Sequence, residues 1–184
     1  MLKRLKRDEG IILVVLIFIA AFSFLFDELA FSSLDSIRNT LLDSFMSFVS
    51  SPITITAIVL FIFINLSMQR SFKAVKKLVI AGVSSSIAGS IIKIIIARPR
   101  PFGLEKSIPL INYPDFSFPS NHAFVAFSML PVMSDRYPRL KIMFFILAAT
   151  IAAARFYTGM HFFSDIAAGA ALGYLVGLYF LRKA

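Results

Sequence analysis

The chain has 184 residues, of which 58% are hydrophobic and only 16% are charged, and its mean hydropathy is +0.83. A soluble domain of this size could not bury so much apolar surface, so the composition excludes a soluble globular enzyme, a disordered chain and a nucleic-acid-binding module. The net charge of +9 does not require a nucleic-acid partner, because the basic residues lie in short blocks between apolar runs. The absence of cysteine excludes a disulfide scaffold, a cysteine nucleophile and a thiolate metal site.

Six uncharged stretches follow one another along the chain. The first two alone reach the roughly 17–25 residues that a helix needs to cross a bilayer. The later ones reach it when flanking charged residues, such as Lys93, Arg155 and Asp165, are drawn into the bundle. We therefore predict an all-α fold, a polytopic membrane bundle of six transmembrane helices that forms a single integral membrane domain over residues 1–184. The stretches are Gly10–Phe26, Ser51–Gln69, Leu78–Ile92, Pro119–Ser134, Ile142–Ala154 and Ile166–Leu181.

The N-terminal segment, in which four basic residues precede an apolar run, resembles a signal peptide. Asp27-Glu28-Leu29 follows in place of a small-residue cleavage site, so we expect a first helix that is retained in the protein. Leu29–Ser50 then places apolar residues at near-helical spacing with charged residues between them. This pattern predicts an amphipathic helix in the outer membrane interface, between the first two spans, with a plain polar loop as the alternative.

The distribution of lysine and arginine predicts the orientation. If the N-terminus lies inside, the inside segments hold thirteen basic residues and the outside segments hold six. Cytoplasmic loops carry the excess of basic residues, so we expect a multi-pass protein of the cell membrane with both termini in the cytoplasm.

Three glycines recur every four residues in the last span and line one face, at Gly169, Gly173 and Gly177. Small residues at this spacing permit close helix contact. We expect the face to pack inside the bundle, and a homodimer interface is the alternative.

Six ionisable side chains are expected near the outer face, in or beside the connections Lys93–His122 and Arg155–Asp165. Charged groups at membrane depth cost roughly 2.5–3.5 kcal/mol each on insertion scales, so they usually serve a function. The three basic residues outnumber the one acid, and a phosphate ester or diphosphate would supply the missing anion. The six are Lys93, Arg100, His122, Arg155, His161 and Asp165.

His161 and Asp165 are four residues apart and share a helix face. The carboxylate could accept a hydrogen bond from one imidazole nitrogen and leave the other nitrogen nucleophilic. A plain structural contact is the alternative for this pair.

The segment from Phe118 to His122 leads directly into an apolar run. Ser120 is placed as the N-cap of a helix, whose first N–H groups would attract an anion that His122 faces from the first turn. The alternative is a capping serine beside an ordinary interfacial histidine.

Arg98-Pro99-Arg100-Pro101 ends the third helix, because Pro99 disfavours a helical conformation at Arg98. We expect this segment to turn over the site and to offer planar guanidinium groups to phosphate oxygens. A basic loop that faces lipid headgroups is the alternative.

The chain has no Walker loop and no acidic or histidine cluster that could hold two metal ions. With two histidines and few outer carboxylates, a metal-dependent phosphatase is not expected. We therefore expect no metal and no cofactor, which leaves phosphoryl transfer through a histidine.

Three ordered motifs between Lys93 and Asp165 carry a resemblance to a known family. They are Lys93-x6-Arg100-Pro101, then Pro119-Ser120-Asn121-His122, then Ala154-Arg155-x5-His161-x3-Asp165. They resemble the K-x6-R-P, P-S-G-H and S-R-x5-H-x3-D pattern of the type-2 phosphatidic acid phosphatase superfamily, six-helix membrane lipid phosphatases related to the vanadium haloperoxidases. Asn121 stands in place of the family's glycine and Ala154 in place of its serine, which puts phosphate affinity and substrate choice in question.

The resemblance implies a role for each matching residue. His161 is the nucleophile that forms a phosphohistidine, Asp165 orients it, and His122 is the general acid that protonates the leaving oxygen. The phosphate is held by Lys93, Arg100, Ser120, Asn121 and Arg155.

The sequence thus predicts a lipid phosphatase whose site lies at the extracytoplasmic face. The segments 97–102 and 117–123 look similar to the polyprenyl-diphosphate phosphatase branch, so a polyprenyl diphosphate is the favoured substrate. A phosphatidylglycerophosphate or phosphatidic acid phosphatase, a lipid phosphotransferase, and an anion transporter are the alternatives.

Overall fold

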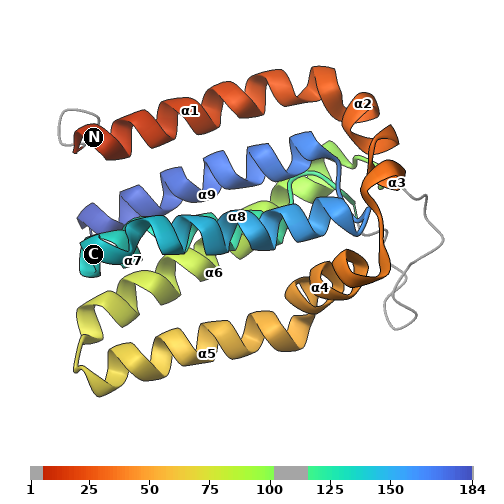
Figure 1. Ribbon diagram of the computed structural model, residues 1–184. Helices are drawn as coiled ribbons and strands as arrows, with labels where there is room; N and C mark the ends of the chain where they lie inside the picture. Colours follow the sequence, from red (N-terminus) through yellow and green to blue (C-terminus); the bar gives the residue numbers. More distant parts are fainter. Residues whose placement is uncertain (1–5, 102–115, 184) are drawn as a thin grey trace.

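The computed structural model describes residues 6–101 and 116–183, apart from the side chain of Asp35. Every regular element among these residues is a helix, and most helices run along one common direction (Figure 1). In chain order they are α1 (Arg7–Ser23), the 3₁₀ turn η2 (Phe24–Phe26), α2 (Asp27–Ser32), α3 (Leu34–Ile37), α4 (Thr40–Ser50), α5 (Pro52–Met68), α6 (Phe72–Ile96), α7 (Asn121–Arg136), the 3₁₀ turn η4 (Pro138–Leu140), α8 (Lys141–Tyr157) and α9 (Phe163–Lys183).

Four helical stretches are long and apolar enough to cross a membrane, and the pair α4 and α5, bent by 53° at Ser51, adds a fifth if it forms one span. The four are Arg7–Ser32, Phe72–Ile96, Pro138–Tyr157 and Phe163–Lys183. α7 has 16 residues, fewer than the roughly 17–25 that span a bilayer alone. The chain is therefore an all-helical membrane protein with four or five candidate spans among the described residues, and the predicted total of six stays a prediction.

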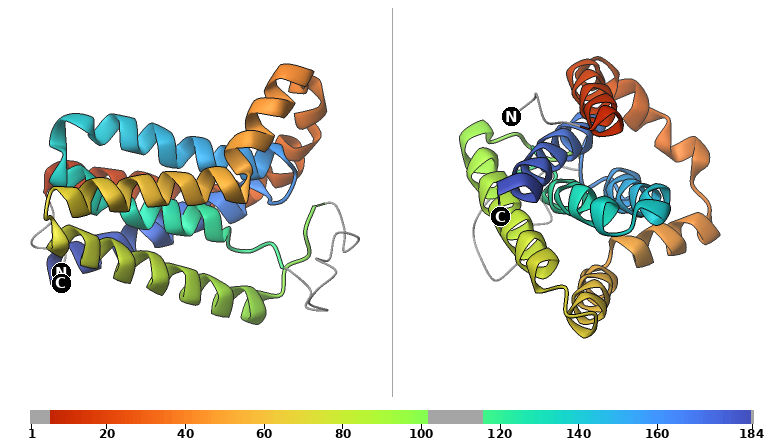
Figure 2. Two further views of the ribbon diagram at one scale, coloured as in Figure 1. Left: turned by 90° about the horizontal axis from the view of Figure 1, so that it is seen from below. Right: turned by 90° about the vertical axis from the view of Figure 1, so that its left-hand side faces the viewer.

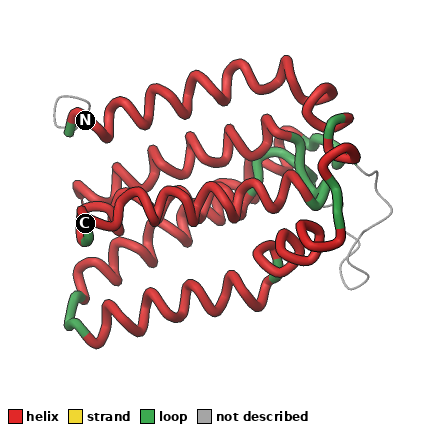
Figure 3. Tube along the Cα trace, in the orientation of Figure 1, coloured by secondary structure: helices red, strands yellow, loops and turns green. Residues whose placement is uncertain are grey.

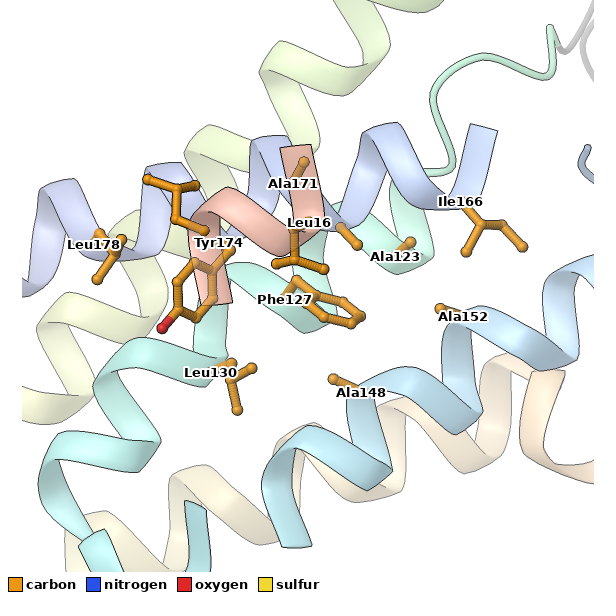
Figure 4. Close-up of a cluster of buried hydrophobic side chains, with 12 residues drawn as sticks. Leu16, Ala123, Phe127, Leu130, Ala148, Ala152, Ile166, Ala171, Tyr174 and Leu178 are labelled. Atoms are coloured by element: carbon orange, nitrogen blue, oxygen red, sulfur yellow. The ribbon is translucent and has the colours of Figure 1, made fainter. Parts of the chain in front are cut away.

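α7 lies at the centre of the bundle, in contact with α6, α8 and α9, as the end-on view in Figure 2 shows. The largest cluster of buried side chains joins α1, α7, α8 and α9 around Phe127 and Tyr174 (Figure 4). The outward faces of α1, α5 and α6 carry exposed Ile, Leu, Val and Phe side chains, as expected for helices that face lipid.

The glycine face of α9 is packed against α7. A Cβ atom built at Gly169, Gly173 or Gly177 would lie 2.7, 2.1 or 2.2 Å from a backbone carbonyl oxygen of α7 or of the residue before it. Only glycine permits this approach. The prediction that this face packs inside the bundle is confirmed, and a homodimer is a separate question that this packing does not address.

The segment expected to form one amphipathic helix, Leu29–Ser50, is helical but broken into α2, α3 and α4. Asn39 causes the last break, because its extended backbone and its Oδ1, which accepts from the Leu42 N–H at 3.0 Å, start a new helix. The location of this segment in the membrane interface stays a prediction.

The connections between helices gather at the two ends of the bundle (Figure 3). Both ends of the described chain lie at the same end, together with the α5–α6 and α7–α8 connections (Figure 1). Lys3 and Arg4 of the basic N-terminal block, and the middle of the α6–α7 connection, lie outside the described residues.

Candidate active site

The residues singled out in the sequence meet at the end of the bundle opposite the termini. α6 and α8 end there and α7 and α9 begin there, because neighbouring helices run in opposite directions (Figure 1). Lys93 and Arg155 lie in the last turns of α6 and α8, and Asp165 lies in the first turn of α9. His122, the second residue of α7, lies within electrostatic range of His161.

The second imidazole, His161, lies in the connection between α8 and α9 and is almost fully buried. Its Nδ1 is 3.6 Å from Oδ2 of the buried Asp165, which is close enough for an ionic contact but too long for a hydrogen bond. The same Oδ2 accepts the Phe162 N–H at 2.8 Å. Catalytic hydrogen bonds are often long in structures without substrate, so this separation is compatible with a carboxylate that orients the imidazole.

Burial lowers the pKa of His161 to about 4, against the opposing effect of Asp165, and the positive charges of Arg100 and Lys93 lower it further. The imidazole is therefore neutral at neutral pH. A neutral imidazole has a lone pair, which nucleophilic attack requires.

Two cations tie the connections of this end together. Lys93 donates from Nζ to the carbonyl oxygens of Phe116 and Ser117, the latter at 3.4 Å, and Arg100 donates to the carbonyl oxygen of Met160. Both act electrostatically on the two histidines. Two positive charges thus lie within electrostatic range of both imidazoles.

Ser120 occupies the N-cap position of α7, as predicted, but its side chain makes no capping hydrogen bond. Its N–H donates to the carbonyl oxygen of Asp165 at 3.0 Å, which joins the start of α7 to the start of α9. Its Oγ is fully buried and has no hydrogen-bond partner within the described part of the chain. A buried hydroxyl without a partner is costly, and a phosphate oxygen at the α7 N-terminus would supply one.

The sequence model of the PAP2 superfamily matches residues 74–184. This range includes the five candidate residues placed at this end of the bundle, Lys93, His122, Arg155, His161 and Asp165. The chain belongs to the PAP2 superfamily. It is 35% identical to phosphatidylglycerophosphatase B of Bacillus subtilis over 108 residues, which cover 53% of this chain and 50% of that protein. It is 26% identical to undecaprenyl-diphosphatase BcrC of the same organism over 147 residues, which cover 79% and 76% of the two chains.

The fold comparison covers more of the chain. A crystal structure of a transmembrane PAP2-type phosphatidylglycerolphosphate phosphatase from B. subtilis superimposes with a TM-score of 0.67 and 21% identity, over 95% of this chain and 92% of that one. At this identity the likeness concerns the fold alone. The chain spans about half the length of the first curated relatives that it matches.

Asn121, one departure from the PAP2 pattern, directs its side chain toward α6. Its Nδ2 donates to Ser90 Oγ at 3.4 Å, and its Oδ1 occupies the space that a Cβ on Gly89 would need, 1.9 Å away. The amide is thus engaged between two helices. Any contact from Asn121 to a phosphate would therefore come from its backbone N–H, because the first N–H groups of a helix have no acceptor within that helix.

Ala154, the other departure, is fully buried against Val49 and Ile151. The neighbouring Arg155 donates from Nη1 to Ser50 Oγ, in the last residue of α4, at 2.8 Å. The hydroxyl of Ser50 in α4 therefore contacts Arg155, next to the position where the third motif has Ala154 in place of the family's serine. No motif marks Ser50, so the sequence did not reveal it.

Arg98 differs from the expectation that both arginines of the Arg-Pro-Arg-Pro segment face phosphate. Its guanidinium group lies between Asp27 and Asp165, with Nη2 2.8 Å from Asp27 Oδ2 and Nη1 2.8 Å from Asp165 Oδ1. The sequence did not indicate that Asp27 would lie beside the candidate site residues. The available signal was a carboxylate next to an apolar span, where burial is costly without a partner.

An apolar cavity of about 320 Å³ opens beside His122 and Asn121. It follows α7 as far as Met133, which on a helix is on the order of 16 Å. Its other walls are aliphatic and aromatic side chains of α5 and α8, such as Ile55, Ile62 and Phe144. The cavity is therefore lined almost entirely by apolar side chains, and His122 lies at its edge.

Proposed function

We propose that this chain is a membrane lipid phosphatase that hydrolyses a lipid phosphate or diphosphate through a phosphohistidine on His161. One observation carries the proposal. A neutral, buried imidazole lies beside an oriented carboxylate and within electrostatic range of a second imidazole and of basic side chains. Phosphoryl transfer needs chiefly positioning and positive charge, and this arrangement supplies both.

The reaction proceeds in two steps. Nε2 of His161, the nitrogen turned away from Asp165, attacks phosphorus, and the bond to the leaving oxygen breaks as His122 donates a proton to that oxygen. Water then attacks the phosphohistidine, gives its proton to His122, and releases inorganic phosphate. Lys93, Arg100, Arg155, Ser120 and the Asn121 N–H hold the phosphate oxygens throughout.

The favoured substrate is a polyprenyl diphosphate, whose chain would occupy the apolar cavity beside α7. Support comes from the cavity itself and from the similarity to undecaprenyl-diphosphatase BcrC over most of the chain. A glycerolipid phosphate is the second candidate, because the identity to phosphatidylglycerophosphatase B is higher over a shorter region.

The proposed topology has six spans in one domain, in the cell membrane, with both termini in the cytoplasm and the site at the extracytoplasmic face. The excess of basic residues in the segments assigned to the inside supports this orientation. So does the bundle, in which both ends of the described chain lie at the end opposite the histidines (Figure 1).

The test is a phosphate-release panel on purified protein in lipid micelles. The substrates are polyprenyl diphosphate, polyprenyl phosphate, phosphatidylglycerophosphate and phosphatidic acid, each assayed with the unaltered protein and with His161→Gln. We expect polyprenyl diphosphate to be hydrolysed fastest and His161→Gln to abolish release from every lipid. Normal hydrolysis by His161→Gln would overturn the proposal.

The same panel separates the alternatives. Phosphate release that depends on an added lipid alcohol, with the phosphoryl group recovered on that alcohol, would identify a phosphotransferase. Anion flux without any hydrolysis would identify a transporter. Full activity in excess EDTA is expected, and loss of activity that Mg²⁺ restores would contradict direct histidine catalysis.

A further inference from the structure

Arg98 links two buried carboxylates that come from distant parts of the chain. Asp27 lies at the start of α2, and Asp165 lies in the first turn of α9. The side chains of Asp27 and Asp165 are 7% and 0% exposed, and that of Arg98 is 22% exposed. Buried charges persist only where partners compensate them, and each carboxylate has its partner here in the same guanidinium group.

The backbone directs Arg98 to this position. α6 ends at Ile96, and Ala97 takes the left-handed conformation with φ of 50°, which turns the chain away from the helix axis. The guanidinium carbon then lies 4.0 Å from the ring centroid of Phe162, the residue between His161 and α9. Arg98 is thus held both by its charge and by a ring at the site.

Both oxygens of Asp27 are used within this cluster. Oδ1 accepts the Ser164 N–H at 2.8 Å, and Oδ2 accepts from Ser164 Oγ and from Arg98 Nη2. Arg98 Nη1 also donates to Ser164 Oγ at 2.6 Å. Asp27 therefore fixes Arg98 and the start of α9 in one geometry.

The consequence falls on Asp165. Arg98 occupies its Oδ1, so its Oδ2 remains directed at Nδ1 of His161 and at the Phe162 N–H. Rotation of the carboxylate would break the bond to Arg98. Arg98, which binds the other oxygen of the carboxylate, therefore fixes the orientation of Asp165 relative to His161.

We propose that Arg98 and Asp27 are positioning residues, which act through Asp165 to hold His161 in line for attack. This inference rests on the proposed function of His161. Neither residue is assigned to the phosphate, so both should affect the chemical step more than substrate binding. A purely structural role, in which the cluster only joins α2 to α9, would lower stability and leave the turnover of the folded protein unchanged.

The first experiment measures kcat and KM on the lipid that the panel above shows to be hydrolysed fastest, together with thermal stability. Asp27→Asn and Arg98→Lys should lower kcat by about 10- to 100-fold, the scale on which a misplacement of about 1 Å slows a reaction. KM should change by less than about threefold. Ser164→Ala, which removes one shared hydroxyl, should lower kcat by about three- to tenfold, because fewer hydrogen bonds are lost.

The matched control is Glu9→Gln. Glu9 pairs with Arg182, so it also joins the first helix to α9, but at the opposite end of the bundle. It should lower thermal stability with kcat unchanged. If Asp27→Asn and Arg98→Lys behave like Glu9→Gln, the positioning role is wrong. If Asp27→Asn does not fold, Arg98→Lys and Ser164→Ala decide the question in the same way.

A double-mutant cycle with Asp165→Asn tests whether the effect passes through Asp165. Once Asp165 can no longer orient His161, Asp27→Asn should cost less than about threefold more in kcat. Additive losses would overturn the inference. His161→Gln separates the two proposals: if it remains active the proposed function fails, and if it is inactive while Arg98→Lys retains full kcat, only the positioning role fails.

Discussion

The two ends of the helix bundle use charge in different ways. At the end that holds the termini, Lys6 pairs with Asp135 at 2.9 Å and Lys141 pairs with Asp8 at 2.8 Å. These side chains are about half exposed or more, and each of the two pairs joins one base to one acid. At the histidine end, Arg98 serves two carboxylates that water hardly reaches.

The difference indicates where an anion belongs. Exposed one-to-one pairs are worth about 0–1 kcal/mol each, are screened by salt, and leave no net charge to satisfy. At the histidine end, Lys93, Arg100 and Arg155 all act electrostatically on His122, and the nearby Asp165 is paired with Arg98. Charged groups held at membrane depth are costly, so the cluster of basic side chains beside the two histidines favours a ligand with negative charge.

Among the substitutions considered for the two ends, replacement of His122 should cause the largest loss of kcat. Replacement of His122 by Asn should lower kcat by about 10²- to 10⁴-fold, because the general acid is lost while the buried shape is kept. Phosphate release under saturating lipid measures the effect. A substrate with a more acidic leaving group should recover part of the lost rate, and failure of any such recovery would contradict the role of His122 as the acid.

The dependence of the reaction rate on pH tests the protonation states of the two histidines at this end. Because burial holds the pKa of His161 at about 4, the imidazole stays neutral and nucleophilic above that pH, and kcat/KM should fall as the pH drops through about 4. A bound phosphate would offset the positive charges around His122 and keep a proton on it, so the rate should fall again at higher pH, where His122 in the complex loses that proton. Initial rates across a buffer series would show a bell, and a profile flat from about pH 4 to 9 would contradict two titrating histidines.

The smallest effect is expected at the end that holds the termini. Lys141→Gln removes an exposed pair with Asp8, so it should lower the free energy of unfolding by less than about 1 kcal/mol and leave kcat unchanged. Thermal unfolding in detergent and phosphate release measure the two quantities. A loss of turnover in this variant would show that the two ends are coupled.

The sequence predicted an all-helical membrane fold and a cluster of candidate site residues, and the catalytic roles of these residues stay predictions. Spacing alone brought Lys93, His122, Arg155, His161 and Asp165 to one end, because alternating helices place each motif at the same boundary. The partner of Arg98 could not be found this way. Two arginines two residues apart look equivalent in sequence, and only the left-handed turn at Ala97 sends one of them to Asp27.

Two other features depended on tertiary packing as well as on local sequence. The amide of Asn121 fits against Gly89 because α6 and α7 approach closely there. The segment Leu29–Ser50 kept a helical apolar pattern, but the capping side chain of Asn39 divided it. A capping residue inside a periodic segment is visible in a sequence, although its competition with continued helix is decided by tertiary contacts.

The glycine face of α9 also bears on how substrate preference can change. Because carbonyl oxygens of α7 occupy the places where side chains would stand on Gly173 and Gly177, any larger residue there would push apart the two helices that carry His122 and Asp165. The wall formed by α5 is under no such restriction. Under the proposed function, substitutions on α5 could change the chain length or branching of the accepted lipid over generations while the reacting groups keep their alignment.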